Sequence, residues 1–225
     1  MSAHKNLGGA EACGVLLARK DVISDTKPTF PGGGTVSFVK GYTKTDVMYD
    51  VDVFNREIAG TPPFLGFYRA ALSFELLKNE IGYDFIHHRE RKNTELFMNL
   101  ITKGNEKLHA KDKTQIIIYG DSNLDKRANV ITFNILFRGE EILQHNLISL
   151  ILADVFGIQL RSGCFCAGPF GMRLLNLDKN TVTSIEEEVS VGILRAKPGY
   201  LRLDLTFYLE LYEIEFIAKA ILGVA

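Results

Sequence analysis

The chain has 225 residues, of which 46% are hydrophobic and 24% are charged, a composition typical of a globular protein. Its formal net charge of −1 gives no electrostatic reason to expect a nucleic acid or an anionic membrane as partner. The first residues lack the apolar core of a secretory signal, and the longest apolar runs are too short to span a bilayer. Three cysteines do not suit a disulfide framework, so we expect a reducing compartment, the cytoplasm or an organelle.

The first sixty residues have the pattern of short strands joined by a flexible loop. An apolar run at 15–18 predicts a buried strand, and residues 36–39 predict a second one. Apolar residues alternate with aspartates over 47–53, which predicts a strand with one polar face. Gly32-Gly33-Gly34 predicts a loop, because glycine adopts backbone angles and close approaches that side chains forbid.

A helical stretch follows this region. Thr61 before two prolines is typical of a helix start, with the threonine as N-cap. The helix carries a wide apolar face, which indicates packing on more than one side. Gly82 is expected to end or kink it, and a polar helix is expected to follow up to Gly104.

From about Lys113 the pattern indicates a compact α/β unit. Mixed charge and few bulky apolar residues predict an irregular segment, without helix or strand, at 178–197. The helix at 145–156 is expected to turn Leu147, Leu150 and Ile151 inward. Strands are expected at 116–118, 131–137 and 201–207, and helices at 145–156 and 209–222.

The segment Ser2-Ala3-His4-Lys5-Asn6-Leu7-Gly8-Gly9 carries the first family resemblance. It resembles the Ser-x-His-Lys-x-x-Gly-Gly segment of class V aminotransferase-fold enzymes, the pyridoxal-phosphate-dependent group that includes cysteine desulfurases and selenocysteine lyases. The resemblance implies that Lys5 forms the Schiff base with pyridoxal 5'-phosphate (PLP) and that His4 contacts its phosphate. The family places this lysine after much of the large domain, and it places an aspartate for the pyridine nitrogen upstream. We therefore expect this chain to be the C-terminal portion of such an enzyme.

The second resemblance lies in the stretch from Arg161 to Gly171. It is similar to the family's Arg-x-Gly-x-x-Cys-Ala-x-Pro loop, which implies that Cys166 attacks the substrate's sulfur or selenium and becomes a persulfide. Such a cysteine needs an accessible loop and nearby positive charge, which Arg161 and Arg173 supply. Gly-Cys-Phe-Cys also resembles molybdenum cofactor sulfurases.

The alternatives for these cysteines are an inert cysteine or a metal site, although Cys164 and Cys166 lack a second ligand pair. Which of the two reacts stays open.

Two further residues match family positions. Arg202 in Gly-Tyr-Leu-Arg-Leu resembles the arginine that binds the substrate carboxylate, as Arg161 is also expected to do, and a planar guanidinium suits that group. An ion pair with Asp204 on the same strand face is the alternative. Thr61 in Gly-Thr-Pro resembles the threonine that contacts the partner subunit's cofactor phosphate. The Tyr-Asn-Thr that usually follows the arginine strand is absent.

The resemblance implies the C-terminal part of a fold type I PLP-transferase, an α/β architecture. Residues 1–60 would be a remnant of the large PLP-binding domain, 61–104 a connecting helical arm, and 105–225 a small α/β domain. Its function would be a PLP-dependent reaction of an amino acid, of the desulfurase, lyase or transaminase type. A homodimer, or association with a chain that carries the missing half, is expected.

Two other hypotheses compete with this one. The first is a truncated, catalytically silent homologue that acts as a dimerisation or partner-binding module, since the upstream cofactor-binding residues are absent. The second is a small redox or metal protein that uses Cys164 and Cys166.

Overall fold

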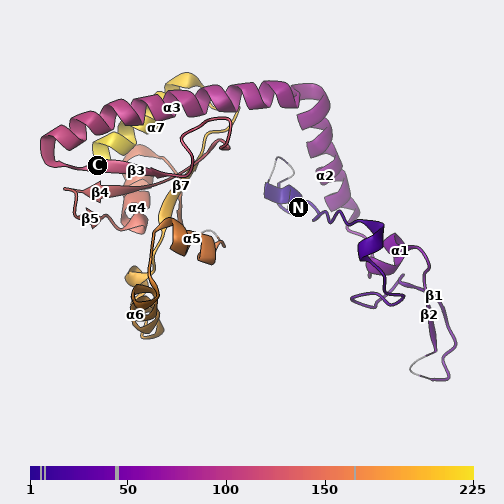
Figure 1. Ribbon diagram of the computed structural model, residues 1–225. Coiled ribbons are helices and arrows are strands. Elements are labelled where there is room, and N and C mark those ends of the chain that lie inside the picture. The colour runs from indigo at the N-terminus through magenta and orange to yellow at the C-terminus, as the bar shows by residue number, and fades with distance from the viewer. Residues whose placement is uncertain (6, 8, 44–45, 165) are drawn as a thin grey trace. The chain divides into compact units, whose positions relative to one another are not determined.

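The computed structural model describes residues 1–5, 7, 9–43, 46–164 and 166–225. The motif positions Asn6, Gly8 and Phe165 therefore lie outside the described residues. The chain divides into two compact units, Met1–Tyr83 and Asp84–Ala225 (Figure 1).

The first unit consists of short elements and one longer helix. Strands β1 and β2 pair in an antiparallel hairpin. The elements are η1 (Ala3–Lys5), η2 (Lys20–Val22), β1 (Val36–Val39), β2 (Val47–Tyr49), α1 (Val53–Glu57), α2 (Phe64–Glu75) and the π-helical turn η3 (Leu76–Ile81).

The strand predicted at 15–18 is wrong. Leu16 and Leu17 are each 87% exposed and lie in no strand, and the nearest pairing is a single bridge between Gly14 and Ser2. A buried strand needs neighbouring strands on both edges to satisfy its backbone groups. The described part of Met1–Tyr83 supplies none for this segment, so its apolar side chains remain exposed.

Two helix starts also differ from the sequence-based expectation. The predicted strand at 47–53 stops at Tyr49, because the Asp52 carboxylate accepts a hydrogen bond from the Asn55 amide at 3.1 Å and caps α1. Helix α2 begins at Phe64 with Pro63 as its N-cap, so Thr61 precedes the cap and is exposed.

The helix end predicted at Gly82 is confirmed, because η3 ends at Ile81 and Gly82 is its C-cap. Gly82 adopts a left-handed conformation (φ 86°) between η3 and α3 (Tyr83–Asp112). Helix α3 does not end at Gly104 but continues to Asp112. A Cβ atom at Gly104 would lie 2.3 Å from Leu222 Cδ2, so this glycine allows a close approach between α3 and α7.

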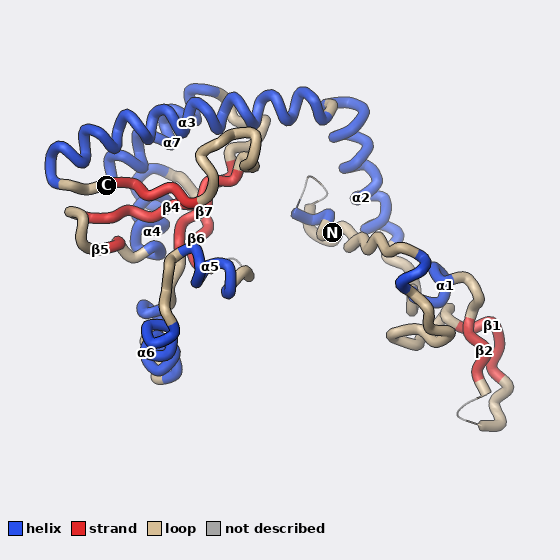
Figure 2. The backbone as a smooth tube through the Cα atoms, in the orientation of Figure 1, coloured by secondary structure: helices blue, strands red, loops and turns tan. Residues whose placement is uncertain are grey.

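The second unit contains a twisted antiparallel sheet (Figure 2). Its strand order is β3-β4-β7-β6, and β5 pairs with β4. The strands are β3 (Gln115–Tyr119), β4 (Val130–Phe137), β5 (Glu141–Ile142), β6 (Arg161–Gly163) and β7 (Tyr200–Asp204). The three longer strands cover the sequence-based predictions at 116–118, 131–137 and most of 201–207.

In the described part of this unit, α3 is followed by the α-helices α4 (His145–Phe156), α5 (Gly168–Leu174), α6 (Lys179–Ser190) and α7 (Leu211–Val224), and by the short 3-10 helix η4 (Leu194–Ala196). Helix α4 matches its predicted limits, but it buries Ile148 and Leu152, while Leu147 and Leu150 are about half exposed. The prediction of an irregular segment at 178–197 is wrong. Asp178 accepts a hydrogen bond from the Thr181 amide at 2.8 Å and so starts helix α6.

One apolar core holds Asp84–Ala225 together. Helix α4 packs against α7 and against β6 and β7. The fully buried side chains come from α3, the sheet, α4 and α7, and include Phe97, Ile101, Ile131, Phe133, Leu152, Leu201 and Ile214. Within the described residues, no helix combines the length and the apolar character needed to cross a membrane.

Candidate functional site

The turn that carries Lys5 is anchored by its neighbours. Lys5 ends η1, and its amide donates to the Ser2 carbonyl at 3.0 Å. Ala3 is 1% exposed and belongs to a small apolar cluster with Ala70 of α2. His4 and Lys5 themselves are exposed, so the turn presents an imidazole and an amine to solvent.

The segment after this turn is held against α2. The Cys13 amide donates to the Gly66 carbonyl at 3.2 Å, and a Cβ atom at Gly66 would lie 2.7 Å from the Glu11 carbonyl oxygen. The Arg69 guanidinium donates to the Ala10 carbonyl at 2.6 Å and pairs with Glu11 at 3.2 Å. Helix α2 therefore fixes the chain on the C-terminal side of the lysine turn.

Thr61 lies beside the triple-glycine loop. The Gly60 amide donates to the Gly33 carbonyl at 2.8 Å, and Gly32 approaches Ala59 closely. The two stretches are thus adjacent, and the exposed Thr61 directly follows Gly60.

The cysteine loop is a hydrogen-bonded turn. The Ala167 amide donates to the Cys164 carbonyl at 3.0 Å, and Cys166 adopts a left-handed conformation with φ 61°. Both cysteines are exposed, and no disulfide joins them. The Arg161 Nη2 atom lies 3.8 Å from Cys166 Sγ, which gives the thiol the cationic neighbour that the sequence predicts.

Strand pairing brings Arg161 and Arg202 together. They are direct partners in the β6–β7 register, so their side chains lie on the same face of the sheet. Arg202 also pairs with Asp204 at 3.1 Å, so the alternative predicted for it is present. Two adjacent guanidiniums and one carboxylate leave net positive charge beside the cysteine loop, which favours an anionic ligand.

The residues that support this loop were not predicted from the sequence. The Tyr200 ring is buried, and a Cβ atom at Gly171 of α5 would lie 3.4 Å from it and 3.7 Å from Cys164 Cβ. Burial raises the pKa of the Tyr200 hydroxyl, Cys164 raises it further, and Arg202 lowers it. Tyr200 directly precedes the Leu201-Arg202 match, and this adjacency is the signal that could have identified it.

A buried amide and a buried imidazole position the start of β7. The Asn134 side chain donates to the Gly199 carbonyl at 3.1 Å and to the Tyr119 hydroxyl at 3.2 Å. The His145 Nε2 atom lies 3.2 Å from the Lys197 carbonyl oxygen. A Cβ atom at Gly199 would lie 2.6 Å from His145 Nε2 and 2.8 Å from Gly163 Cα, so only glycine fits between α4 and β6.

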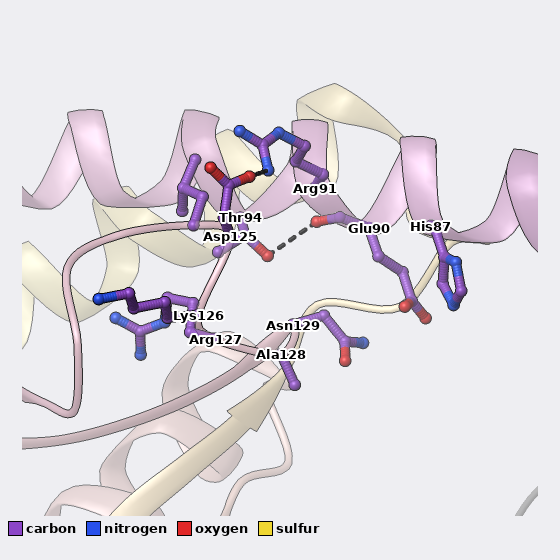
Figure 3. Close-up of a pocket in the computed structure, with 10 residues that line it drawn as sticks. His87, Glu90, Arg91, Thr94, Asp125, Lys126, Arg127, Ala128 and Asn129 are labelled. Carbon is purple, nitrogen blue, oxygen red and sulfur yellow. Dashed lines mark hydrogen bonds and ion pairs between the residues drawn. The ribbon is translucent and has the colours of Figure 1, made fainter.

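A separate cavity of about 570 Å³ lies between α3 and the loop before β4. Figure 3 shows His87 and Glu90 projecting from α3, and Lys126 and Arg127 projecting from the loop. An ion pair between Arg91 and Asp125 joins the two walls. His87 and His88 are both exposed.

Two groups in this cavity have perturbed titration. Burial raises the pKa of the Glu90 carboxyl, and His87 and the Phe207 amide partly oppose this change. Burial lowers the pKa of the Arg127 guanidinium, which donates to the Asp121 and Tyr119 carbonyls. These bonds hold the loop, so Arg127 has a structural role here.

The predicted site residues fall into two groups. Cys166, Arg161 and Arg202 lie together in Asp84–Ala225, while His4, Lys5 and Thr61 lie in Met1–Tyr83. Among the described residues, no group of three histidine, cysteine or acidic side chains has the spacing to hold a metal ion.

A family model described as "Aminotransferase class-V" matches residues 1–214. The chain belongs to the class-V aminotransferase family. It is 31% identical to a probable cysteine desulfurase from Pyrococcus abyssi over 209 residues, which are 89% of this chain and 46% of that protein. It is 29% identical to the molybdenum cofactor sulfurase of Arabidopsis thaliana, over 74% of this chain and 20% of that protein.

The class-V assignment extends to the fold. A cysteine desulfurase from Thermococcus onnurineus NA1 superimposes with a TM-score of 0.62 and 25% identity, over 88% of this chain and 39% of that one. The mixed α/β architecture is thus part of a fold type I PLP-transferase fold. This class-V chain spans about half the length of the Pyrococcus relative.

Proposed function

We propose that this chain is the lysine- and cysteine-bearing part of a PLP-dependent enzyme that acts on an amino acid, similar to the cysteine desulfurases. The observation that carries the proposal is the cluster of Cys166, Arg161 and Arg202 on one exposed edge of the sheet. A thiol beside two guanidiniums combines a nucleophile with a binding site for a carboxylate.

The residues of Met1–Tyr83 fit two ends of the cofactor. The Lys5 amine is exposed on an anchored turn, where it can bond the aldehyde carbon of PLP. The His4 imidazole and the Thr61 hydroxyl are exposed hydrogen-bonding groups that suit a phosphate. When bound, PLP would supply the electron sink for cleaving bonds at the amino-acid substrate.

Cys166 would act as the sulfur acceptor. Its thiolate attacks the sulfur of a cysteine substrate, so that an S–S bond forms and the substrate's C–S bond breaks. The electron pair of the broken bond goes to the substrate carbon, which takes up a proton to give alanine. Arg161 favours the thiolate form through its charge, and Arg202 would bind the substrate carboxylate.

Under this proposal, residues 1–60 contribute to the cofactor-binding domain. Residues 61–104 form a connecting arm, and 105–225 form the domain with the nucleophile. We infer a cytoplasmic location, because three cysteines do not suit a disulfide framework.

The first test is attachment of PLP to the full chain. We expect visible absorbance on mixing with PLP, and borohydride reduction should then fix the cofactor on the peptide that contains Lys5. Lys5→Ala should lose both signals, while Lys20→Ala, which changes another exposed lysine, should retain them. Attachment that is equal in both variants would contradict the assignment of Lys5.

The second test is sulfur transfer from cysteine. We expect cysteine to give alanine and a sulfur-modified Cys166, detected by mass spectrometry under non-reducing conditions. Cys166→Ser should abolish the modification, and Cys13→Ser should leave it unchanged. Amino transfer without sulfur release would instead indicate a transaminase.

A non-catalytic partner-binding role is the second candidate. It is supported by exposed apolar side chains along α2, among them Leu65, Tyr68 and Leu72, which are 67% to 75% exposed. Under this role we expect an oligomer by light scattering at micromolar concentration and no Lys5-dependent PLP signal. A monomer would contradict it.

A further inference from the structure

The two thiols of the cysteine loop carry an inference that does not depend on the proposed function. Cys164 and Cys166 are both exposed, and the hydrogen bond from the Ala167 amide to the Cys164 carbonyl closes the turn around them. Consecutive Cα atoms are about 3.8 Å apart, so two residues separated by one other have Cα atoms no more than about 7.6 Å apart. This range includes the Cα spacing of disulfides, about 4.4 to 6.8 Å.

The surroundings of the turn give the two thiols different roles. Cys166 has the Arg161 guanidinium 3.8 Å from its sulfur, so it is the thiol whose anion has a cationic neighbour. Cys164 instead lies near Gly171 and the Tyr200 ring. Cys166 is therefore suited to react first, and Cys164 to react with the product.

Gly163 and Gly168 flank the turn. Gly163 has φ 110°, and neither glycine has any atom within 4 Å of a Cβ position. Cys13, the third cysteine, belongs to the other compact unit and is partly buried against alanines.

We propose that Cys164 and Cys166 form a reversible disulfide within the loop, with Cys166 as the attacking thiol and Cys164 as the resolving thiol. The oxidant is a small-molecule disulfide. The Cys166 thiolate attacks it, forming a mixed disulfide and releasing one thiolate. The Cys164 thiolate then attacks the Cys166 sulfur, forming the loop disulfide and releasing the second thiolate, so the two cysteines are oxidised and the small disulfide is reduced. A dithiol reverses both steps.

The experiment incubates the full chain with glutathione disulfide and maps its cysteines by mass spectrometry without reduction. We expect the wild-type loop peptide to lose two hydrogens and to retain no glutathione. Cys164→Ser should stop at the mixed disulfide and retain one glutathione on Cys166. Because the resolving attack is intramolecular, wild type should retain glutathione about tenfold less than Cys164→Ser.

Two controls separate this proposal from sulfur transfer. Cys13→Ser should behave as wild type, and so should Lys5→Ala, because the readout needs neither PLP nor an amino-acid substrate. Equal retention of glutathione by wild type and Cys164→Ser would overturn the proposal, and so would a disulfide that joins two chains. Loss of cysteine-dependent sulfur transfer in these samples would bear only on the proposed function.

Discussion

The two compact units differ in how they bury apolar surface. Asp84–Ala225 encloses large side chains from a sheet and three helices in one core, including Phe97, Phe133 and Leu201. The buried apolar cluster described for Met1–Tyr83 contains three alanines, while large side chains such as Leu16 and Phe30 stay exposed. Because burial of apolar area supplies most folding free energy, the second unit has the means to stabilise itself. The first unit requires apolar surface from elsewhere.

The candidate site has the same division. The cysteine and its two arginines lie on a sheet backed by the large core, so strand register sets their spacing. The lysine turn is held mainly by backbone hydrogen bonds and small side chains of α2. We therefore expect the cysteine edge to be the more rigid of the two parts.

The largest expected effect is on the core of the second unit. Phe133 is fully buried, so Phe133→Ala should lower the free energy of unfolding by about 3 to 5 kcal/mol. Leu65 in the first unit is 75% exposed, and Leu65→Ala should change stability by less than about 0.5 kcal/mol. Urea denaturation followed by circular dichroism measures both. Comparable losses of stability in the two variants would mean that Leu65 is buried in solution. That result would contradict the difference between the two units.

An intermediate effect is expected where the second unit supports the site. Gly199→Ala should lower stability by about 1 to 3 kcal/mol, because the new methyl group meets His145 and the Gly163 backbone. Displacement of β6 should also reduce the reactivity of Cys166 toward a thiol reagent. Gly223→Ala in α7 is the matched control, since it has open space around it. Stability equal to wild type in Gly199→Ala would show that β6 can move freely.

The smallest expected effect depends on pH. Burial raises the pKa of the Glu90 carboxyl in the folded chain, so the folded state favours the protonated form. The free energy of unfolding is therefore higher at low pH, and this contribution is lost as the pH rises through the folded pKa. Glu90→Gln removes the buried charge. Its melting temperature should match wild type near pH 4, close to the ordinary carboxyl pKa, and should exceed it at about pH 7. If Glu90→Gln raises the melting temperature equally at both pH values, titration of Glu90 is not the cause.

Much of the second unit follows from local pattern. Alternating apolar residues identify β4 and β7, and Gly157 in the left-handed conformation ends α4 where the sequence predicts. Helix α6 was missed although Asp178 caps it and its apolar residues Val182, Ile185 and Val189 recur at helical spacing. None of the three is fully buried, and the charged residues between them hid this short apolar stripe.

By itself, the sequence determined the family, through the lysine segment and the cysteine loop, and it named Lys5, Cys166 and Arg202 as candidates. These motifs are local, because the chemistry needs particular groups at fixed short spacing. Only the tertiary structure decided that Arg161 and Arg202 are strand partners, that Arg161 approaches Cys166, and that Tyr200 and Asn134 support the loop. Such relations depend on strand register and packing between residues far apart in the chain, which periodicity does not encode.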